Sequence, residues 1–251
     1  MLDVQVFQVS QTIWCVRRPS YFTCSYIVRT PQGIVLIDAG MNSQGKDMEA
    51  GLAHIGETPA AIQAILFTHW HNDHAAGGRA LQQKSKAPVY YHADEAPFMT
   101  RQTASPGLRG RVSELLPEWG VLVLLKGLLG NAIPEPIEAS ALLRDGQTLL
   151  DSFEVIETPG HTPGHVSYYY PAEKALFAGD ALAVLSGRVR FMARPVTPDL
   201  EAARASILRC LARDIDLLCP GHRRPLTRDT RQRCREMLDY LEKGGKWPLL
   251  G

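Results

Sequence analysis

Hydrophobic positions in the first forty residues come in short runs that predict β-strands. The runs lie at residues 4–7, 12–16, 24–28 and 33–37. They are rich in β-branched and aromatic residues and are separated by Ser, Pro and Gly. The period then changes, because Met48, Leu52 and Ile55 lie at helical spacing, while a short apolar run at 64–67 indicates a buried strand. A strand, helix, strand order therefore follows an N-terminal meander.

The second half of the chain continues this mixture of strands and helices. Apolar runs predict strands at residues 89–91, 153–156, 166–170, 175–177 and 215–218. Helical spacing predicts helices after Asp73, at about 199–212 and at 228–242. Strands with helices interspersed in both halves indicate a layered α/β architecture, with sheets packed together and helices outside.

The segment at about 98–146 interrupts this regular order. It holds a Ser-Pro-Gly turn sequence, an apolar block at 119–125 and a Pro-Glu-Pro sequence. Long excursions between regular elements are often functional, so we interpret it as an insertion or lid in a single domain that spans residues 1–251. The apolar block suits core packing, a lid over an acyl substrate or the interface of a homodimer.

The composition is that of an ordinary globular protein. Of 251 residues, 45% are hydrophobic and 21% are charged, which excludes a disordered chain or a coiled coil. The net charge is +1, so the whole molecule has no strong field for polyanions. Between Arg188 and Arg235, however, twelve arginines stand against five acidic residues, a local excess of +7.

Cysteine usage and the N-terminal sequence predict a cytoplasmic protein. The five cysteines are Cys15, Cys24, Cys210, Cys219 and Cys234. Their number is odd and they lack CxxC spacing, so we expect them to be reduced and mostly buried. The residues after Met1 lack the basic and long apolar regions of a signal peptide, and no apolar stretch reaches the length of a membrane span.

The highest density of candidate metal-binding side chains lies directly after the strand predicted at 64–67. The sequence there, from residue 68 to 74, is Thr-His-Trp-His-Asn-Asp-His. On a loop at a strand end, His69 and His71 can converge on one metal while Asp73 and His74 turn toward a second. Imidazole and carboxylate are good Zn²⁺ ligands, and the absence of thiolates argues against a closed structural zinc site.

Three further polar side chains follow apolar runs that resemble strands. His161 and His222 each come directly after a Pro-Gly pair, which forms a rigid turn. Asp180 comes at the end of the apolar run that begins at residue 175. Strand ends that project His, Asp and His toward one edge of a sheet predict a dinuclear metal site.

This pattern resembles the metallo-β-lactamase fold superfamily of metal hydrolases. The family pattern is an early Asp after a strand, the motif HxHxDH, a distant His, a distant Asp and a final His. It runs here from about residue 24 to 224. The resemblance implies a four-layer αββα sandwich, with the metals at one edge of the two sheets.

The resemblance also implies a role for each residue. One metal would be held by His69, His71 and His161, the other by Asp73, His74 and His222, and Asp180 would bridge the two. Asp38 would orient ligands rather than bind, and His165 would support the site through a hydrogen bond. Two Zn²⁺ ions are the expected cofactors, and iron is the alternative because the same ligands suit it.

These metals imply a hydrolase for a small molecule. A hydroxide that bridges two Zn²⁺ ions can attack an ester, thioester or lactone bond near neutral pH. Asp73 is also the candidate catalytic residue, which accepts or relays a proton as the leaving group departs. The bridging Asp and the lack of an export signal favour the glyoxalase II and lactonase branch. Finally, Arg188, Arg190 and Arg194 are candidates for contact with an anionic substrate group.

Several alternatives stay open at this stage. A mononuclear iron persulfide dioxygenase of the glyoxalase type uses His and Asp ligands that this chain also supplies. A metal-dependent phosphodiesterase or nuclease would use the basic region, but such relatives usually add exosite arms or a second domain. A non-catalytic scaffold is disfavoured because all seven ligand positions are filled. Residues 40–46 also fit a phosphate loop, except that Asp47 replaces the final Ser or Thr, and a turn into a helix is the simpler interpretation.

Overall fold

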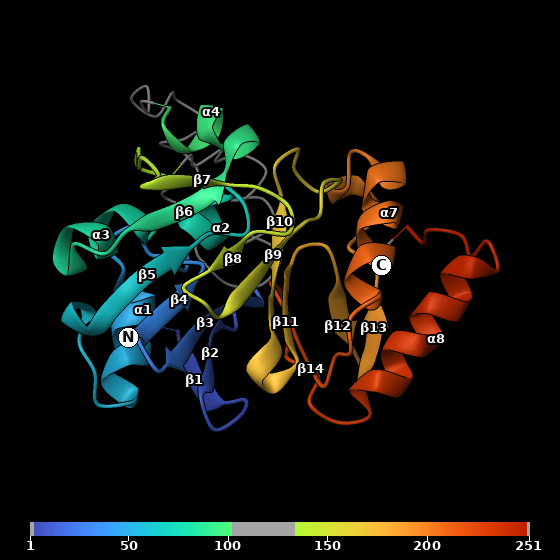
Figure 1. Ribbon diagram of the computed structural model, residues 1–251, viewed down its shortest axis with the longest axis horizontal. Coiled ribbons are helices and arrows are strands. Elements are labelled where there is room, and N and C mark those ends of the chain that lie inside the picture. The colour runs from blue at the N-terminus through green and yellow to red at the C-terminus, as the bar shows by residue number, and fades with distance from the viewer. Residues whose placement is uncertain (1–2, 102–133, 250–251) are drawn as a thin grey trace.

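The computed structural model describes residues 3–101 and 134–249 (Figure 1). Two β-sheets lie face to face at its centre, and helices cover their outer faces. The expected four-layer αββα sandwich is therefore confirmed. Most of the expected insertion at 98–146, including the apolar block at 119–125, lies outside the described residues, and the single-domain organisation stays a prediction.

The first sheet has seven strands that neighbour one another in chain order. They are β1 (Gln5–Gln8), β2 (Ile13–Arg18), β3 (Thr23–Thr30), β4 (Gly33–Ile37), β5 (Ile62–Leu66), β6 (Val89–His92) and β7 (Ala141–Leu143). Strands β1 to β4 form the antiparallel meander that the sequence predicts, and β4 to β7 are parallel. Parallel neighbours require crossover connections, which pass through the helices between β4 and β6.

The second sheet has five strands in the order β14-β11-β10-β9-β8. They are β8 (Thr148–Leu149), β9 (Phe153–Glu157), β10 (Val166–Tyr170), β11 (Ala175–Gly179) and β14 (Leu217–Pro220). A separate hairpin consists of β12 (Ala183–Leu185) and β13 (Arg188–Arg190). Strand β14 begins two residues later than the predicted strand at 215–218.

Helices pack on the outer face of each sheet. The helices are α1 (Lys46–His54), α2 (Asn72–Ala75), α3 (Gly78–Ser85), α4 (Ala96–Met99), α7 (Leu200–Leu211) and α8 (Thr230–Glu242). Short 3-10 turns are η1 (Pro59–Ala61), η2 (Ala93–Glu95), η3 (Pro171–Glu173) and η4 (Arg194–Val196). Met48 of α1 and Leu81 of α3 belong to the core of the first sheet, and Ile207 of α7 and Met237 of α8 to the outer core of the second.

Alternate residues of an inner strand pack into two different hydrophobic cores, one between the sheets and one beneath the helices. In β4, Val35 and Ile37 pack between the sheets, whereas Ile34 and Leu36 pack beneath the helices. Successive side chains of a strand point to opposite faces, so a strand covered on both sides must be apolar at every position. This is why these strands appear in the sequence as continuous apolar runs.

The sequence predicts a helix after Asp73. The structure has two short helices in this region, α2 and α3, instead of one. The break comes at Gly77, where an added Cβ would lie 2.3 Å from the carbonyl oxygen of Ala39. The backbone N–H of Gly77 donates to the carbonyl oxygen of Gly40, so this part of the chain packs closely against the segment that follows β4. The hairpin β12-β13 was also not predicted, although Ser186 and Gly187 form a two-residue turn with positive φ, a known hairpin signal.

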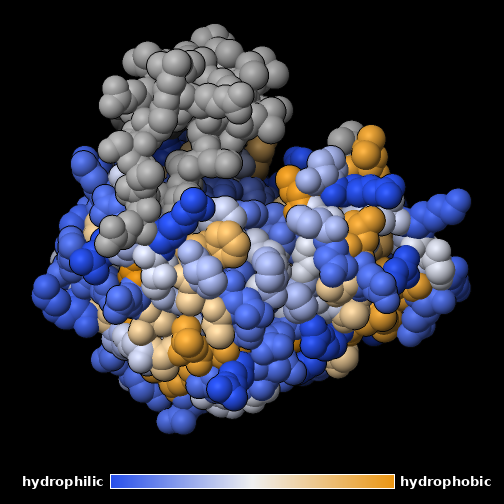
Figure 2. Space-filling model, turned by 90° about the horizontal axis from the view of Figure 1, so that it is seen from above, coloured by the Kyte–Doolittle hydropathy of each residue, from blue (hydrophilic) through white to orange (hydrophobic). Residues whose placement is uncertain are grey.

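The burial of the cysteines and the polarity of the surface are those expected for a globular protein of this composition. All five cysteines are free and buried, as expected. The face seen from above is mostly hydrophilic, with separate hydrophobic areas (Figure 2). Single exposed hydrophobic side chains are normal on a protein surface, so they do not test the predicted homodimer. In the part of the chain that the structure describes, no helix is long and apolar enough to cross a membrane.

Candidate metal centre

The predicted ligands come together at one edge of the two sheets. His69 and His71 follow β5, His161 follows β9, and Asp180 and His222 follow β11 and β14. The loop after β5 is joined to the second sheet, because the backbone N–H of Val166 donates to the carbonyl oxygen of Thr68 at 2.9 Å. In Figure 1 this edge lies near α2 and the adjacent ends of β9 and β10.

Three imidazoles form the first half of the site. His69, His71 and His161 each offer one nitrogen, and these atoms lie within 4.8 Å of one another. Nδ1 of His71 lies 3.1 Å from Nε2 of His69 and 2.9 Å from Nε2 of His161. Ring nitrogens that point at one another in this way share a position where a cation can bind all three.

Asp73, His74 and His222 form the second half, with ligand atoms again within 4.8 Å of one another. Oδ2 of Asp73 lies 3.4 Å from Nε2 of His222 and 3.6 Å from Nε2 of His74. This half is less enclosed than the first, since the side chains of Asp73 and His222 are each 21% exposed.

Asp180 lies between the two halves. Its Oδ2 is 3.3 Å from Nε2 of both His161 and His222, and its Oδ1 is 3.6 Å from Nε2 of His74. Oδ1 is buried and accepts no hydrogen bond from any residue that the structure describes. A buried carboxylate oxygen without a donor is costly, and a metal ion would compensate it. The donor set, imidazole and carboxylate without thiolate, suits zinc or iron.

Asp38 supports this cluster without entering it. Its Oδ2 lies 2.8 Å from Nδ1 of His74, and its Oδ1 accepts the backbone N–H of Thr68 at 2.8 Å. A carboxylate on Nδ1 leaves Nε2 of His74 directed at the ligand cluster. The structure places Asp38 beside His74, and its role in orienting a metal ligand stays a prediction.

His165 holds the backbone of Asp180. Nε2 of His165 accepts the backbone N–H of Asp180 at 2.9 Å, and its Nδ1 lies 2.7 Å from Oγ1 of Thr158. The ring is fully buried, and burial lowers its pKa to about 3, so it stays neutral and can accept this bond. His165 thus contacts the backbone of a predicted ligand, and its supporting role at a metal site stays a prediction.

The three candidate arginines lie in different surroundings. Arg188 and Arg190 of β13 line a groove against α8, together with Met237 and Tyr240, and none of the predicted ligands lines that groove. Arg194 begins η4, whose Val196 carbonyl oxygen accepts a hydrogen bond from Nδ1 of His161 at 2.5 Å. Arg194 therefore lies on a segment that contacts a predicted ligand, and the role of all three arginines in substrate binding stays a prediction.

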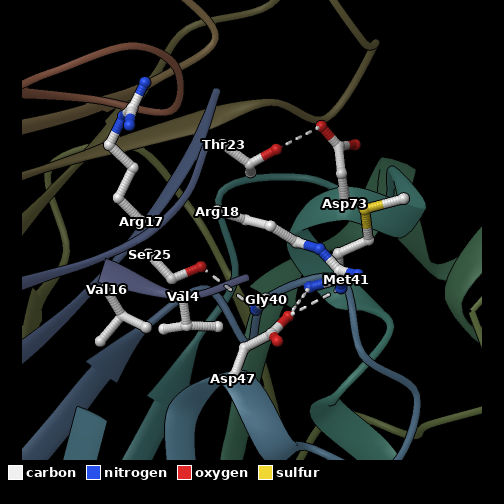
Figure 3. A pocket seen from close by; sticks show the side chains of 10 residues that line it. All are labelled: Val4, Val16, Arg17, Arg18, Thr23, Ser25, Gly40, Met41, Asp47 and Asp73. Atoms are coloured by element: carbon white, nitrogen blue, oxygen red, sulfur yellow. Dashed lines mark hydrogen bonds and ion pairs between the residues drawn. The ribbon is translucent and has the colours of Figure 1, made fainter. Parts of the chain in front are cut away.

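The phosphate-loop interpretation of residues 40–46 does not fit the structure. Oδ2 of Asp47 accepts the backbone N–H groups of Met41 and Asn42 at 3.0 and 2.9 Å, and it pairs with Arg18 at 3.5 Å (Figure 3). These N–H groups are the ones that a bound phosphate would need. The segment is the turn into α1, as the helical spacing indicates.

Burial and neighbouring charges divide the imidazoles into two groups. Burial lowers the pKa of His69 and His161, and it lowers the pKa of His71 to about 4. Burial alone would also lower the pKa of His74 and His222, but nearby carboxylates, above all Asp73 for His74 and Asp180 for His222, raise them to about 10 and about 9. The three imidazoles of the first half are therefore neutral. The two imidazoles of the second half are protonated when no metal is bound.

Metal uptake is expected to become tighter as the pH rises from about 6 to about 9. The raised pKa values of His74 and His222 mean that a bound metal must displace a proton from each ring. The apparent affinity should then rise about tenfold per pH unit for each proton displaced. Competition with a chromogenic chelator at several pH values measures this slope, with His54→Gln on the exposed end of α1 as the control. An apparent affinity that does not change with pH would contradict the protonation of His74 and His222 in the metal-free protein.

The αββα sandwich, with imidazoles and carboxylates gathered at one sheet edge, defines a metal-dependent hydrolase. A family profile described as "Metallo-beta-lactamase superfamily" matches residues 21–222. The chain belongs to this superfamily.

Individual relatives agree with this assignment. The "Probable metallo-hydrolase YflN" of Bacillus subtilis is 32% identical over 78% of this chain and 78% of its own length. A hydroxyacylglutathione hydrolase of Rhodopseudomonas palustris is 30% identical over 80% of this chain and 64% of its own length. The solved structure of TTHA1623 in a di-iron-bound form is 29% identical, with a TM-score of 0.62 over 84% of this chain and 93% of that chain.

Proposed function

We propose that this chain is a dinuclear metal-dependent hydrolase that cleaves an ester, thioester or lactone bond of a small molecule. The observation that carries the proposal is the buried position of Asp180 between two groups of three ligands. His69, His71 and His161 would hold one ion, and Asp73, His74 and His222 the other. When bound, two such ions supply an activated water and polarise the substrate carbonyl.

Zinc is the metal we favour, and iron is the alternative. The ligand types suit both metals, and the relative TTHA1623 was solved with two irons. The named activity of the Rhodopseudomonas relative, hydrolysis of an acylated glutathione, supports a thioester among the candidate bonds. This chain spans less than two thirds of that relative, so glutathione recognition is not part of the proposal.

Asp73 is proposed to move a proton as well as to bind metal. Burial would raise its pKa, but the charges of His74 and His222 lower it, so Asp73 is a carboxylate at neutral pH. Its side chain is 21% exposed, more than that of Asp180, and Oγ1 of Thr23 donates to its Oδ2 at 3.4 Å (Figure 3). A partly exposed carboxylate beside the reacting group can accept a proton and release it to solvent.

Replacing Asp73 by asparagine is expected to lower kcat about 100-fold when metal is supplied in excess, since general acid-base catalysis contributes about 10² or more. The change keeps the shape of the side chain but removes its proton affinity. Steady-state kinetics with metal analysis of the same sample measures the effect, and Asp94→Asn is the control. Full turnover with both metals bound would exclude the proton role.

Metal analysis and a substrate panel test the proposed function together. The protein is purified without added metal or chelator, its metal content is measured by plasma mass spectrometry, and it is assayed with thioesters, lactones, aryl esters and phosphodiesters. About two zinc ions per chain with hydrolysis of a carbonyl substrate would support the proposal. One iron per chain with oxidation of a persulfide, or cleavage of phosphodiesters alone, would replace it with one of the alternatives. If the chain took up no metal, the non-catalytic scaffold would remain as the best interpretation.

A further inference from the structure

A buried carboxylate outside the ligand set joins the two loops that carry the first half of the site. The first loop contains His69 and His71, and the second contains His161 and His165. Glu95 lies between these loops and is completely buried. It ends η2 and was not singled out from the sequence, because nothing in the local pattern around it indicates a site.

Each oxygen of Glu95 accepts a hydrogen bond from a different loop. Oε2 accepts the backbone N–H of Trp70 at 2.7 Å, and Oε1 accepts the backbone N–H of Gly164 at 2.8 Å. Trp70 lies between the ligands His69 and His71, and Gly164 lies between His161 and His165. The carboxylate therefore sets the distance between the two ligand loops through their main chains. Hydrogen bonds to a carboxylate are stronger than those between neutral groups. Gly164 is buried, so leaving its N–H without an acceptor would cost free energy.

The segment around Glu95 is itself held in place. His92, directly before η2, pairs through Nε2 with Oε1 of Glu157 at the end of β9, at 2.9 Å. Phe98 of α4 stacks on the ring of Trp70, with centroids 4.7 Å apart and planes inclined by 12°. Trp70 is thus held by its backbone and by its ring from the same stretch of chain, which restricts the loop between His69 and His71.

Gly164 gives a second, independent reason to connect Glu95 with the site. A Cβ at this position would lie 2.8 Å from the backbone nitrogen of Glu95 and 3.0 Å from its Cγ. The close approach that brings the N–H of Gly164 onto the carboxylate therefore requires glycine. This explains the second Pro-Gly pair of the sequence Thr-Pro-Gly-His-Thr-Pro-Gly-His, since its His165 is not a predicted metal ligand.

We propose that Glu95 is a positioning residue that fixes His71 relative to His161 and so preorganises the first half of the metal centre. The inference rests on the proposed function, because it concerns the same metal centre. Groups that orient metal ligands typically contribute about 10- to 100-fold to metal affinity. Here the orientation acts through the backbone of the residues between the ligands rather than through their rings.

Three variants test this role. Glu95→Ala removes both acceptors, Glu95→Gln keeps one acceptor at nearly the same size, and Gly164→Ala pushes the two segments apart. Asp94→Asn is the matched control, because it removes one negative charge from the adjacent residue, whose side chain is 64% exposed. Two readouts are used: the rate of zinc release to a chromogenic chelator, and the hydrogen exchange of the Trp70 and Gly164 amides in metal-free protein.

We expect zinc release to be about 10- to 100-fold faster in Glu95→Ala and Gly164→Ala, intermediate in Glu95→Gln and unchanged in Asp94→Asn. The amides of Trp70 and Gly164 should lose protection in the same order. Wild-type release rates in Glu95→Gln and Gly164→Ala would overturn the positioning role, whether or not Glu95→Ala folds. Wild-type protein that binds no metal would overturn the proposed function, and with it this role, even if the amides still show that Glu95 joins the loops.

Discussion

Replacing Asp180 by alanine is expected to lower kcat/KM at least about 10³-fold. Asp180 is the only residue of the predicted set whose carboxylate lies within 3.6 Å of His74, His161 and His222. Removing it takes a shared negative charge from between the two halves, and the remaining ligands can no longer hold two cations close together. A metal contributes several kcal/mol of transition-state stabilisation, and about 1.4 kcal/mol corresponds to a tenfold change in rate.

Metal content and kinetics of Asp180→Ala are measured on the same preparation. Fewer than two metals per chain is the expected result, with the folded state checked by circular dichroism. Asp239→Ala, on the exposed side of α8, is the control for loss of one carboxylate. Two metals per chain with undiminished turnover would contradict the bridging position proposed for Asp180.

Removing the metals is expected to lower Tm by about 10 °C and to abolish activity reversibly. A ligand present at about 1,000 times its Kd stabilises the native state by about 4 kcal/mol, and in a chain of this size about 1 kcal/mol shifts Tm by 2–4 °C. The stabilisation is expected because the proposed ligands come from four separate segments, which only the folded chain brings together.

The measurement is a thermal melt with and without chelator, followed by addition of zinc, iron(II) or magnesium. Zinc or iron should restore both Tm and activity, whereas magnesium should not, because it prefers an all-oxygen environment. A variant His69→Ala should show a smaller response to chelator than the wild type. If chelator changed the Tm of both proteins equally, the stabilisation would arise at some other site.

Most of the strands, and the residues proposed to bind metal, could be identified from the sequence for local reasons. Inner strands such as β4 are buried on both faces, so their apolar runs are unmistakable, and the helical spacing of Met48 and Leu52 marks α1. The motif that contains His69 to His74 is compact enough to place four ligands on one loop and short helix. Pro-Gly before His161 and before His222 indicates turns at strand ends, where side chains meet at a sheet edge.

Contacts between distant segments could not be predicted in this way. Arg188 and Arg190 follow Asp180 closely along the chain, yet β13 carries them to a groove against α8. Closeness in sequence does not place their side chains at the site. The hairpin β12-β13 determines the direction in which the chain leaves the site. The break of the helix at Gly77 likewise depends on the carbonyl oxygen of Ala39, which lies on another segment.

By itself, the sequence of this protein determined most of its strands and helices and which residue types are available to bind metal, since both follow from local periodicity and composition. Only the tertiary structure decided which supporting groups contact those ligands. Glu95 reaches Gly164 across 69 residues, and His165 reaches Asp180 across 15. Such contacts arise when two sheets pack against each other and bury a polar group, which must then find a partner wherever the packing places it.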